Sequence, residues 1–175
     1  MSEDGFKRFT IDAIARESNV ARMTVYYQFQ SKAGIFEALA DDLAARGKIR
    51  ENAEAAFRSE DTREGLAKLI FAFAHFWLAD TDVMRKLHAL SVLDPESSAS
   101  ERDAWRREAI TTMMRRVRKQ YRSPAGKAHQ RNIDAIYMLT GFDLVQSLAR
   151  NGLSERQIVD QICEVASAAI GLDLG

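Results

Sequence analysis

A group of side chains suited to contacting DNA lies between Arg22 and Gln28. Arginine can donate two hydrogen bonds to O6 and N7 of guanine, and threonine and glutamine can bond phosphates or base edges. Methionine and tyrosine offer apolar contact to thymine methyl groups. If the segment is a helix, most of these side chains are expected to point outward, away from the core. The alternative is an ordinary surface helix packed by Val25, Tyr26 and Phe29.

Two short helical patterns joined by a turn would position these side chains. The first follows Thr10, whose side chain can cap a helix N-terminus, and the second spans residues 22–28. Asn19 lies where the chain must reverse, and asparagine tolerates a left-handed backbone. Ser31 is predicted to cap a third helix, whose apolar stripe extends to about residue 57. The segment therefore predicts a helix-turn-helix whose second helix enters the DNA major groove.

The overall composition limits the class of protein. Among 175 residues, Lys plus Arg and Asp plus Glu number 25 each, so any attraction to DNA must come from local arrangement. The two prolines and the helical spacing of apolar residues predict an all-α fold. The acidic first residues, and the lack of an apolar run of ~18 residues, predict a cytoplasmic protein that does not enter a membrane.

Catalytic and metal-binding arrangements are not predicted. His75, His88 and His129 lie on separate segments, and the sequence contains no HExxH, CxxC or glycine-rich phosphate loop. Cys163 has no neighbouring base in the sequence and is expected to be a small buried apolar residue. We therefore expect no enzyme activity, no catalytic residue, no metal site and no cofactor.

Further helices are predicted after the helix-turn-helix. The chain from Thr62 is apolar on nearly all faces, which predicts a central helix, and a following helix is expected to stop at Pro95. A long helix is predicted over residues 101–121. One more is predicted along the stripe from residue 133 to 148, and the last begins at a capping box formed by Ser154 and Gln157.

The region from residue 101 to 131 is strongly basic. It contains ten Lys or Arg against three acids. A second nucleic-acid surface is one interpretation. The basic residues alternate with an apolar stripe at helical spacing, however, which favours a solvated helix face.

The N-terminal segment resembles the TetR (tetracycline-repressor-like) family of transcriptional regulators. The resemblance covers residues 5–43, and the rest of the chain matches only in length and helical character. The matching positions are Gly5-Phe6, Thr10, Ile14-Ala15, Asn19-Val20, Thr24, Tyr26, Phe29 and Ser31-Lys32.

The resemblance implies an all-α fold with two domains. Residues 1–45 would form the helix-turn-helix domain, and residues 46–175 a larger helical domain for effector binding and dimerisation. Ala21 stands where the family usually has a capping residue, which costs ~1 kcal/mol of helix stability. The implied DNA-binding residues are Thr10, Arg22, Met23, Thr24, Tyr26, Tyr27, Gln28 and Lys32.

The family's first helix has no counterpart in residues 1–4, which are too few to form it. We therefore expect the helix-turn-helix to lack that support. Its apolar residues Ile11, Ile14, Val25 and Phe29 are expected to be partly uncovered.

The resemblance also implies an effector pocket and a four-helix dimer interface. An apolar or aromatic effector would suit the Phe, Trp and Met residues of the larger domain, although ordinary core packing is the alternative. The implied lining residues are Phe73, Trp77, Met84, His88, Trp105 and Met113. The implied interface residues, for which packing within one chain is the alternative, are Tyr137, Gly141, Leu144, Leu148, Ile158, Ile162, Val165 and Ala169.

Two functional hypotheses follow. The first is a ligand-responsive homodimeric regulator, more often a repressor in this family, that binds a pseudo-palindromic double-stranded DNA operator and is released by a small-molecule effector. The second is a truncated ligand-binding or dimerisation protein without competent DNA binding. Operator binding distinguishes them.

Overall fold

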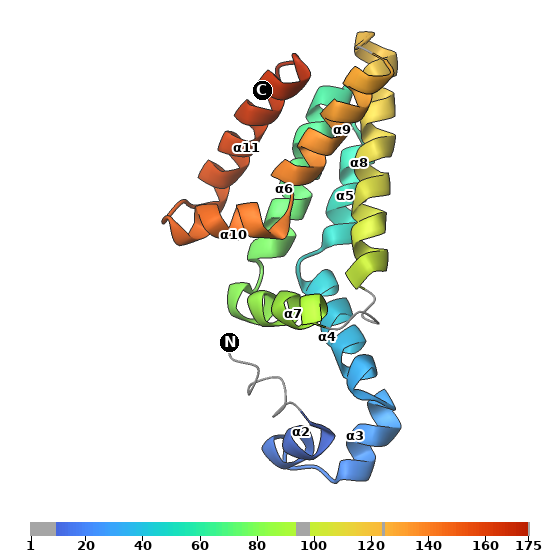
Figure 1. The fold of residues 1–175 in the computed structure, drawn as a ribbon, viewed down its shortest axis with the longest axis vertical. Helices are drawn as coiled ribbons and strands as arrows, with labels where there is room; N and C mark the ends of the chain where they lie inside the picture. The colour runs from blue at the N-terminus through green and yellow to red at the C-terminus, as the bar shows by residue number, and fades with distance from the viewer. Residues whose placement is uncertain (1–9, 94–98, 124, 175) are drawn as a thin grey trace.

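The computed structural model describes residues 10–93, 99–123 and 125–174, and within them it contains helices and no strand. This confirms the all-α prediction. The molecule is elongated, with α2 and α3 at one end and α4 leading from them toward a bundle formed by most of the other helices (Figure 1). The helices are α2 (Ile11–Glu17), α3 (Arg22–Phe29), α4 (Lys32–Arg46), α5 (Ile49–Arg58), α6 (Thr62–Leu78), α7 (Thr81–Leu93), α8 (Ala99–Tyr121), α9 (Lys127–Leu139), α10 (Phe142–Arg150) and α11 (Glu155–Ile170).

Helix α6 is the central helix of the bundle, as its apolar sequence predicts. It packs against α5, α8, α10 and α11, and its Leu66 and Phe73 are fully buried. Burial of each such side chain contributes ~1.5–3 kcal/mol. At Gly65 the helices approach so closely that a Cβ atom would lie 2.8 Å from the Ala56 carbonyl oxygen and 3.2 Å from Met113 Cε.

The prediction of one helix from Ser31 to about residue 57 is wrong. Helix α4 ends at Arg46, and the chain turns before α5 begins. Gly47 is buried, and a Cβ atom there would lie 3.1 Å from Phe76 Cδ2. Lys48 adopts the left-handed conformation, with φ 47°. The apolar spacing continues through this turn, so periodicity alone could not show the break.

The stripe from residue 133 to 148 likewise belongs to two helices, α9 and α10. The buried guanidinium of Arg106 donates hydrogen bonds to the Tyr137 carbonyl oxygen (2.7 Å) and to Thr140 Oγ1 (3.2 Å). These bonds satisfy polar groups at the end of α9. Gly141 is the N-cap of α10 and not a close-approach position within one long helix.

Ion pairs through Arg102 and Arg46 join α4 to the rest of the chain. Arg102 of α8 donates to Glu37 Oε2 over 2.5 Å, and Arg46 Nη1 lies 3.3 Å from Asp80 Oδ2 in the turn between α6 and α7. Helix α4 also packs against α7. These contacts fix the direction in which α4 carries α2 and α3.

Two local predictions are confirmed in the C-terminal region. Ser154 and Gln157 form the capping box at the start of α11. Cys163 is buried, and this burial raises the pKa of its thiol to about 11, so it packs as an apolar residue. The predicted stop at Pro95 lies outside the described residues.

Candidate nucleic-acid interface

Helix α2 and the turn after it are fixed by local hydrogen bonds. Thr10 Oγ1 accepts from the Ala13 amide at 3.1 Å, which confirms the predicted cap. Asn19 has a φ of 53°, the left-handed conformation predicted for it. The Val20 amide then donates to the Ala15 carbonyl oxygen at 2.9 Å and closes the turn. The start of α3 is therefore held close to the end of α2.

Helix α3 points most of its side chains into solvent. Only Val25 is buried, at 4% exposure, and Phe29 is half-buried. Met23, Tyr26 and Tyr27 are 53%, 51% and 77% exposed. Tyr26 is therefore not one of the packing residues of α3, which removes one part of the surface-helix alternative. Such an outward set of two phenols and a thioether is suited to apolar contact with base edges.

The expectation of uncovered apolar residues holds only in part. Val25 is buried, contrary to expectation, while Ile11, Ile14 and Phe29 are half-buried. The predicted lack of a first helix concerns residues 1–9, which lie outside the described residues. Ala21 makes no side-chain hydrogen bond at the start of α3, as its methyl side chain requires.

An ion pair connects the two helices on their exposed side. Arg22 Nε lies 3.1 Å from Asp12 Oδ1, and the two side chains are 70% and 64% exposed. In DNA binding the same guanidinium would have to leave this carboxylate for a phosphate or a guanine. The sequence alone does not identify Asp12, because its pairing with a residue ten positions later depends on the turn geometry.

The junction between α3 and α4 is unusually close. Gln30 has a φ of 62°, and Ser31 Oγ accepts from the Gly34 amide at 3.0 Å, which confirms the predicted cap of α4. A Cβ atom at position 34 would lie 2.0 Å from the carbonyl oxygen of Phe29. Glycine is therefore required at this position. Lys32, at the first position of α4, lies over the Phe36 ring at 5.8 Å from its centroid.

The predicted DNA-binding residues all lie on α3 or at the starts of α2 and α4. Residues 10–36 carry three cations, Arg16, Arg22 and Lys32, against two acids, Asp12 and Glu17. The charge of this surface is therefore nearly balanced. Attraction to DNA would depend on a few placed side chains and not on a strong field.

The predicted effector residues do not line one cavity. Phe73, Met84 and Met113 are buried. Trp77 donates its indole N–H to the Thr140 carbonyl oxygen at 3.0 Å, and Trp105 is 44% exposed. These positions favour core packing for the three buried residues.

Four of the six predicted effector residues make ring contacts, in two separate groups. Phe73 meets Trp105 edge to face at 6.0 Å between ring centroids. Trp77 and His88 both contact Phe142, at 5.6 Å and 4.3 Å. Of these six residues, only Trp105 lines one of the two open cavities described below.

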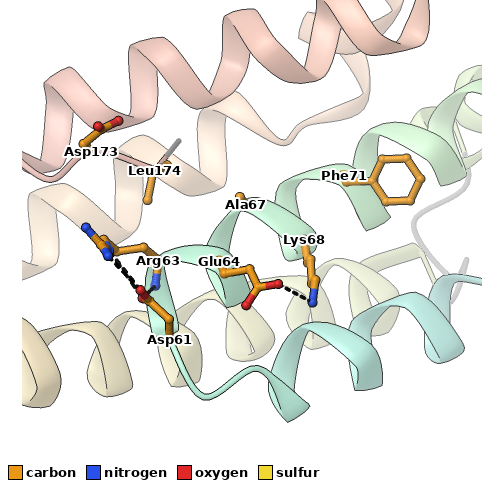
Figure 2. A pocket seen from close by; sticks show the side chains of 8 residues that line it. All are labelled: Asp61, Arg63, Glu64, Ala67, Lys68, Phe71, Asp173 and Leu174. Carbon is orange, nitrogen blue, oxygen red and sulfur yellow. Dashed lines mark hydrogen bonds and ion pairs between the residues drawn. The ribbon is translucent and has the colours of Figure 1, made fainter.

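One of these cavities, of about 430 Å³, lies at the start of α6 beside the C-terminal residues Asp173 and Leu174 (Figure 2). Its cations are paired: Arg63 Nη2 lies 2.8 Å from Asp61 Oδ2, and Lys68 Nζ 2.8 Å from Glu64. Hydrogen bonds from Arg63 and the Tyr121 hydroxyl hold the pKa of the Asp61 carboxyl well below its usual range. This cavity offers no unpaired charge for a ligand. Its full lining is Asp61, Arg63, Glu64, Ala67, Lys68, Phe71, Asp173 and Leu174.

The predicted dimer residues occupy two different environments. Ile158 and Ile162 are buried in the core of the single chain, so they cannot be exposed interface residues. Val165 is 46% exposed, and Ala169, one turn further, is exposed as well. The remaining four, Tyr137, Gly141, Leu144 and Leu148, are half-buried.

No group of three or more His, Cys, Asp or Glu residues within the described ranges is placed to hold a metal ion. None of the helices described is long and apolar enough to cross a membrane.

The comparisons with known proteins concern the segment that carries α2 and α3. The family model described as bacterial regulatory proteins, tetR family, matches residues 1–39. The match contains α2, α3, the turn between them and the first half of α4. No curated protein matches the sequence.

Proposed function

We propose that this chain, which belongs through its N-terminal segment to the tetR family of bacterial regulatory proteins, is a ligand-responsive transcriptional repressor. Two copies bind a pseudo-palindromic double-stranded operator, with their α3 helices in successive major grooves about one helical turn apart. A small apolar or aromatic effector binds the larger helical region. It favours a conformer with the wrong spacing of the α3 helices, and so lowers operator affinity.

The exposure of α3 is the observation that carries the DNA-binding proposal. Met23, Tyr26 and Tyr27 lie largely in solvent, although a soluble protein gains stability by covering such groups. They share one short helix with Arg22, a suitable guanine ligand, in the segment that the family match covers. Phosphate contacts are assigned to Thr24, Gln28 and Lys32, with Thr10 near the DNA backbone.

The proposal assigns residues 1–45 to DNA binding and residues 46–175 to effector binding and dimerisation. Dimerisation is assigned to the exposed side of α11 and to α10. Operator binding requires access to chromosomal DNA, so we place the protein in the cytoplasm. Members of the family are regulators, and no catalytic role is assigned.

A second candidate function is supported by a separate observation. The α3 helix lacks a side-chain cap, and its arginine is paired with Asp12 on an almost neutral surface. These features would weaken DNA binding. They favour a ligand-binding or dimerisation protein without competent DNA binding.

A gel-shift titration with the promoter region near the gene distinguishes the two functions. We expect sequence-selective binding that weakens steeply as salt rises, because phosphate contacts release counterions. Replacing both Tyr26 and Tyr27 with alanine should lower affinity about tenfold or more, since it removes two apolar base contacts and a loss of ~1.4 kcal/mol is a tenfold change. The fold should survive, as both side chains are at least half exposed.

Met138→Ala provides a matched control, because Met138 is 66% exposed on α9, far from α3 in Figure 1. It should bind DNA as the unaltered chain does. Binding that ignores sequence and salt, or that tolerates the double tyrosine variant, would exclude the repressor function and leave the second candidate.

A further inference from the structure

A groove of about 540 Å³ lies between α5 and α8, which run side by side in the bundle (Figure 1). This volume is within the range of small-molecule sites. The lining residues recur at helical spacing on each helix, so the groove is formed by two facing helix surfaces. They are Arg50, Ala53, Glu54, Phe57 and Arg58 of α5, and Trp105, Glu108, Ala109 and Thr112 of α8.

The apolar part of the groove can accept a flat ring. Ala53 and Ala109 are buried and small, and Phe57 is half-buried beside them. Trp105 is 44% exposed, while its contact with Phe73 supports the indole edge to face from within the core. The indole is thus held in place with much of its surface open to solvent, which suits stacking with an aromatic ligand.

The lining carries two arginines and two glutamates, and Arg50 is the one of these four without a charged partner in the described residues. Glu54 is paired with Arg58 at 3.9 Å, and Glu108 with Arg115 at 3.3 Å. Arg50 has no hydrogen bond or ion pair within the part of the chain that the structure describes. Its guanidinium therefore has its full bidentate donor set available, and carboxylates match that geometry.

We infer that the α5–α8 groove binds a planar aromatic carboxylate, with Trp105 stacking on the ring and Arg50 binding the carboxylate. Nothing in the family match covers this region, which begins after residue 39. The sequence could identify Trp105 by its type. Arg50 could not be identified, because the pairing of the other charges around it depends on the fold.

The regulatory consequence rests on the proposed function. Trp105 lies one helical turn after Arg102, and Arg102 donates to Glu37 of α4. A ligand that shifts α8 at Trp105 therefore acts close to a contact that orients the DNA-binding helices. Binding itself can be measured without DNA, so the groove and the repressor function can fail separately.

Calorimetric titration of the whole chain with three probes of one shape tests the site: 2-naphthoate, 2-naphthalenemethanol and 2-naphthylmethylammonium. We expect 2-naphthoate to bind best. Arg50→Gln should weaken 2-naphthoate about tenfold and leave the alcohol nearly unchanged, since a hydrogen bond to a charged group contributes ~1.5–3 kcal/mol. Trp105→Ala should lower the affinity for 2-naphthoate and for the alcohol alike. The circular dichroism of this variant should show an intact fold.

Arg131→Gln is the matched control, because Arg131 is an exposed arginine on α9 that does not line the groove. It should bind all three probes as the unaltered chain does. The inference is overturned if 2-naphthoate does not bind, if the alcohol or the ammonium probe binds equally well, or if Arg50→Gln leaves 2-naphthoate affinity unchanged.

Discussion

At the scale of single residues, the Arg22–Asp12 pair lies on the α3 surface that is proposed to meet a phosphate backbone. An exposed ion pair of this kind contributes only ~0–1 kcal/mol to stability. Its removal should therefore do little to the fold. Asp12 nevertheless places a negative charge beside the arginine assigned to DNA, where it competes with the ligand.

Asp12→Asn is accordingly expected to strengthen operator binding about two- to fivefold, by freeing the guanidinium and removing repulsion from phosphates. Dissociation constants at two salt concentrations measure the effect, which should be larger at low salt. Glu64→Gln is the control, because Glu64 forms a similar exposed pair with Lys68 on α6, away from the assigned dimer surface. Unchanged or weaker binding by Asp12→Asn would show instead that the carboxylate orients Arg22 for binding.

At the scale of elements, the junction between α3 and α4 decides whether the DNA-binding helices are held firmly. Gly34 lies so close to the Phe29 carbonyl oxygen that any side chain must move α3 away from α4. The obstructing atom, the Phe29 carbonyl oxygen, belongs to the backbone. No flexible side chain can therefore move aside to relieve the clash.

Gly34→Ala should therefore loosen the α3–α4 junction and lower operator affinity about tenfold or more, since backbone strain costs ~1–3 kcal/mol. Hydrogen exchange should become faster in α2 and α3, while the bundle remains protected. Ala33→Ser, at the adjacent exposed position, should behave like the unaltered chain. Normal affinity and exchange in Gly34→Ala would contradict the close packing at this junction.

Elements also show how far the sequence could predict the fold. The caps at Thr10 and Ser31 and the left-handed turn at Asn19 follow from local chemistry, and the structure has all three. The breaks at Gly47 and Gly141 were missed, because apolar spacing continues through both. These breaks depend on distant partners, which are the Phe76 ring for one and the Arg106 guanidinium for the other.

The candidate sites also differ in how far the sequence predicts them, because some depend on neighbouring residues and others on contacts between distant ones. The residues of α3 are consecutive, so their types and spacing are enough to select them. The effector residues were selected by type alone. Type cannot distinguish Met113, which fills the core, from Trp105, which opens onto a groove.

At the scale of the whole molecule, the outer side of α11 is the surface assigned to a second copy. Ile158, Ile162 and Ala166 face the core, while Val165 and Ala169 are exposed on the other side. Figure 1 shows α11 at the edge of the bundle, on the side away from α5 and α8. A partner chain would cover the exposed Val165 and Ala169.

Val165→Glu should therefore convert a dimer into a monomer, because a buried unpaired carboxylate is strongly unfavourable. Light scattering coupled to size exclusion should give the 19.7 kDa mass of one chain for the variant and twice that for the unaltered protein. Met138→Glu introduces the same charge at an exposed position of α9, and this variant should remain dimeric. A monomer in every case would exclude the assigned dimer, and a dimeric Val165→Glu would exclude α11 as its interface.

The ion pairs that α4 forms with Arg102 and Asp80 would let this helix act as a lever with unequal arms. Its 15 residues give a length of about 22 Å. Arg46 lies near Asp80 at the C-terminal end of α4, and Glu37 is bonded to Arg102 part of the way along the helix. Lys32 begins α4 at the end that is joined to α3. If Arg46 is the fulcrum, a displacement of about 1 Å at Glu37 becomes about 1.6 Å at Lys32, and more at α3. In a dimer, α4 would move in both chains. A small shift of α8 would therefore change the distance between the two α3 helices by twice the displacement in one chain.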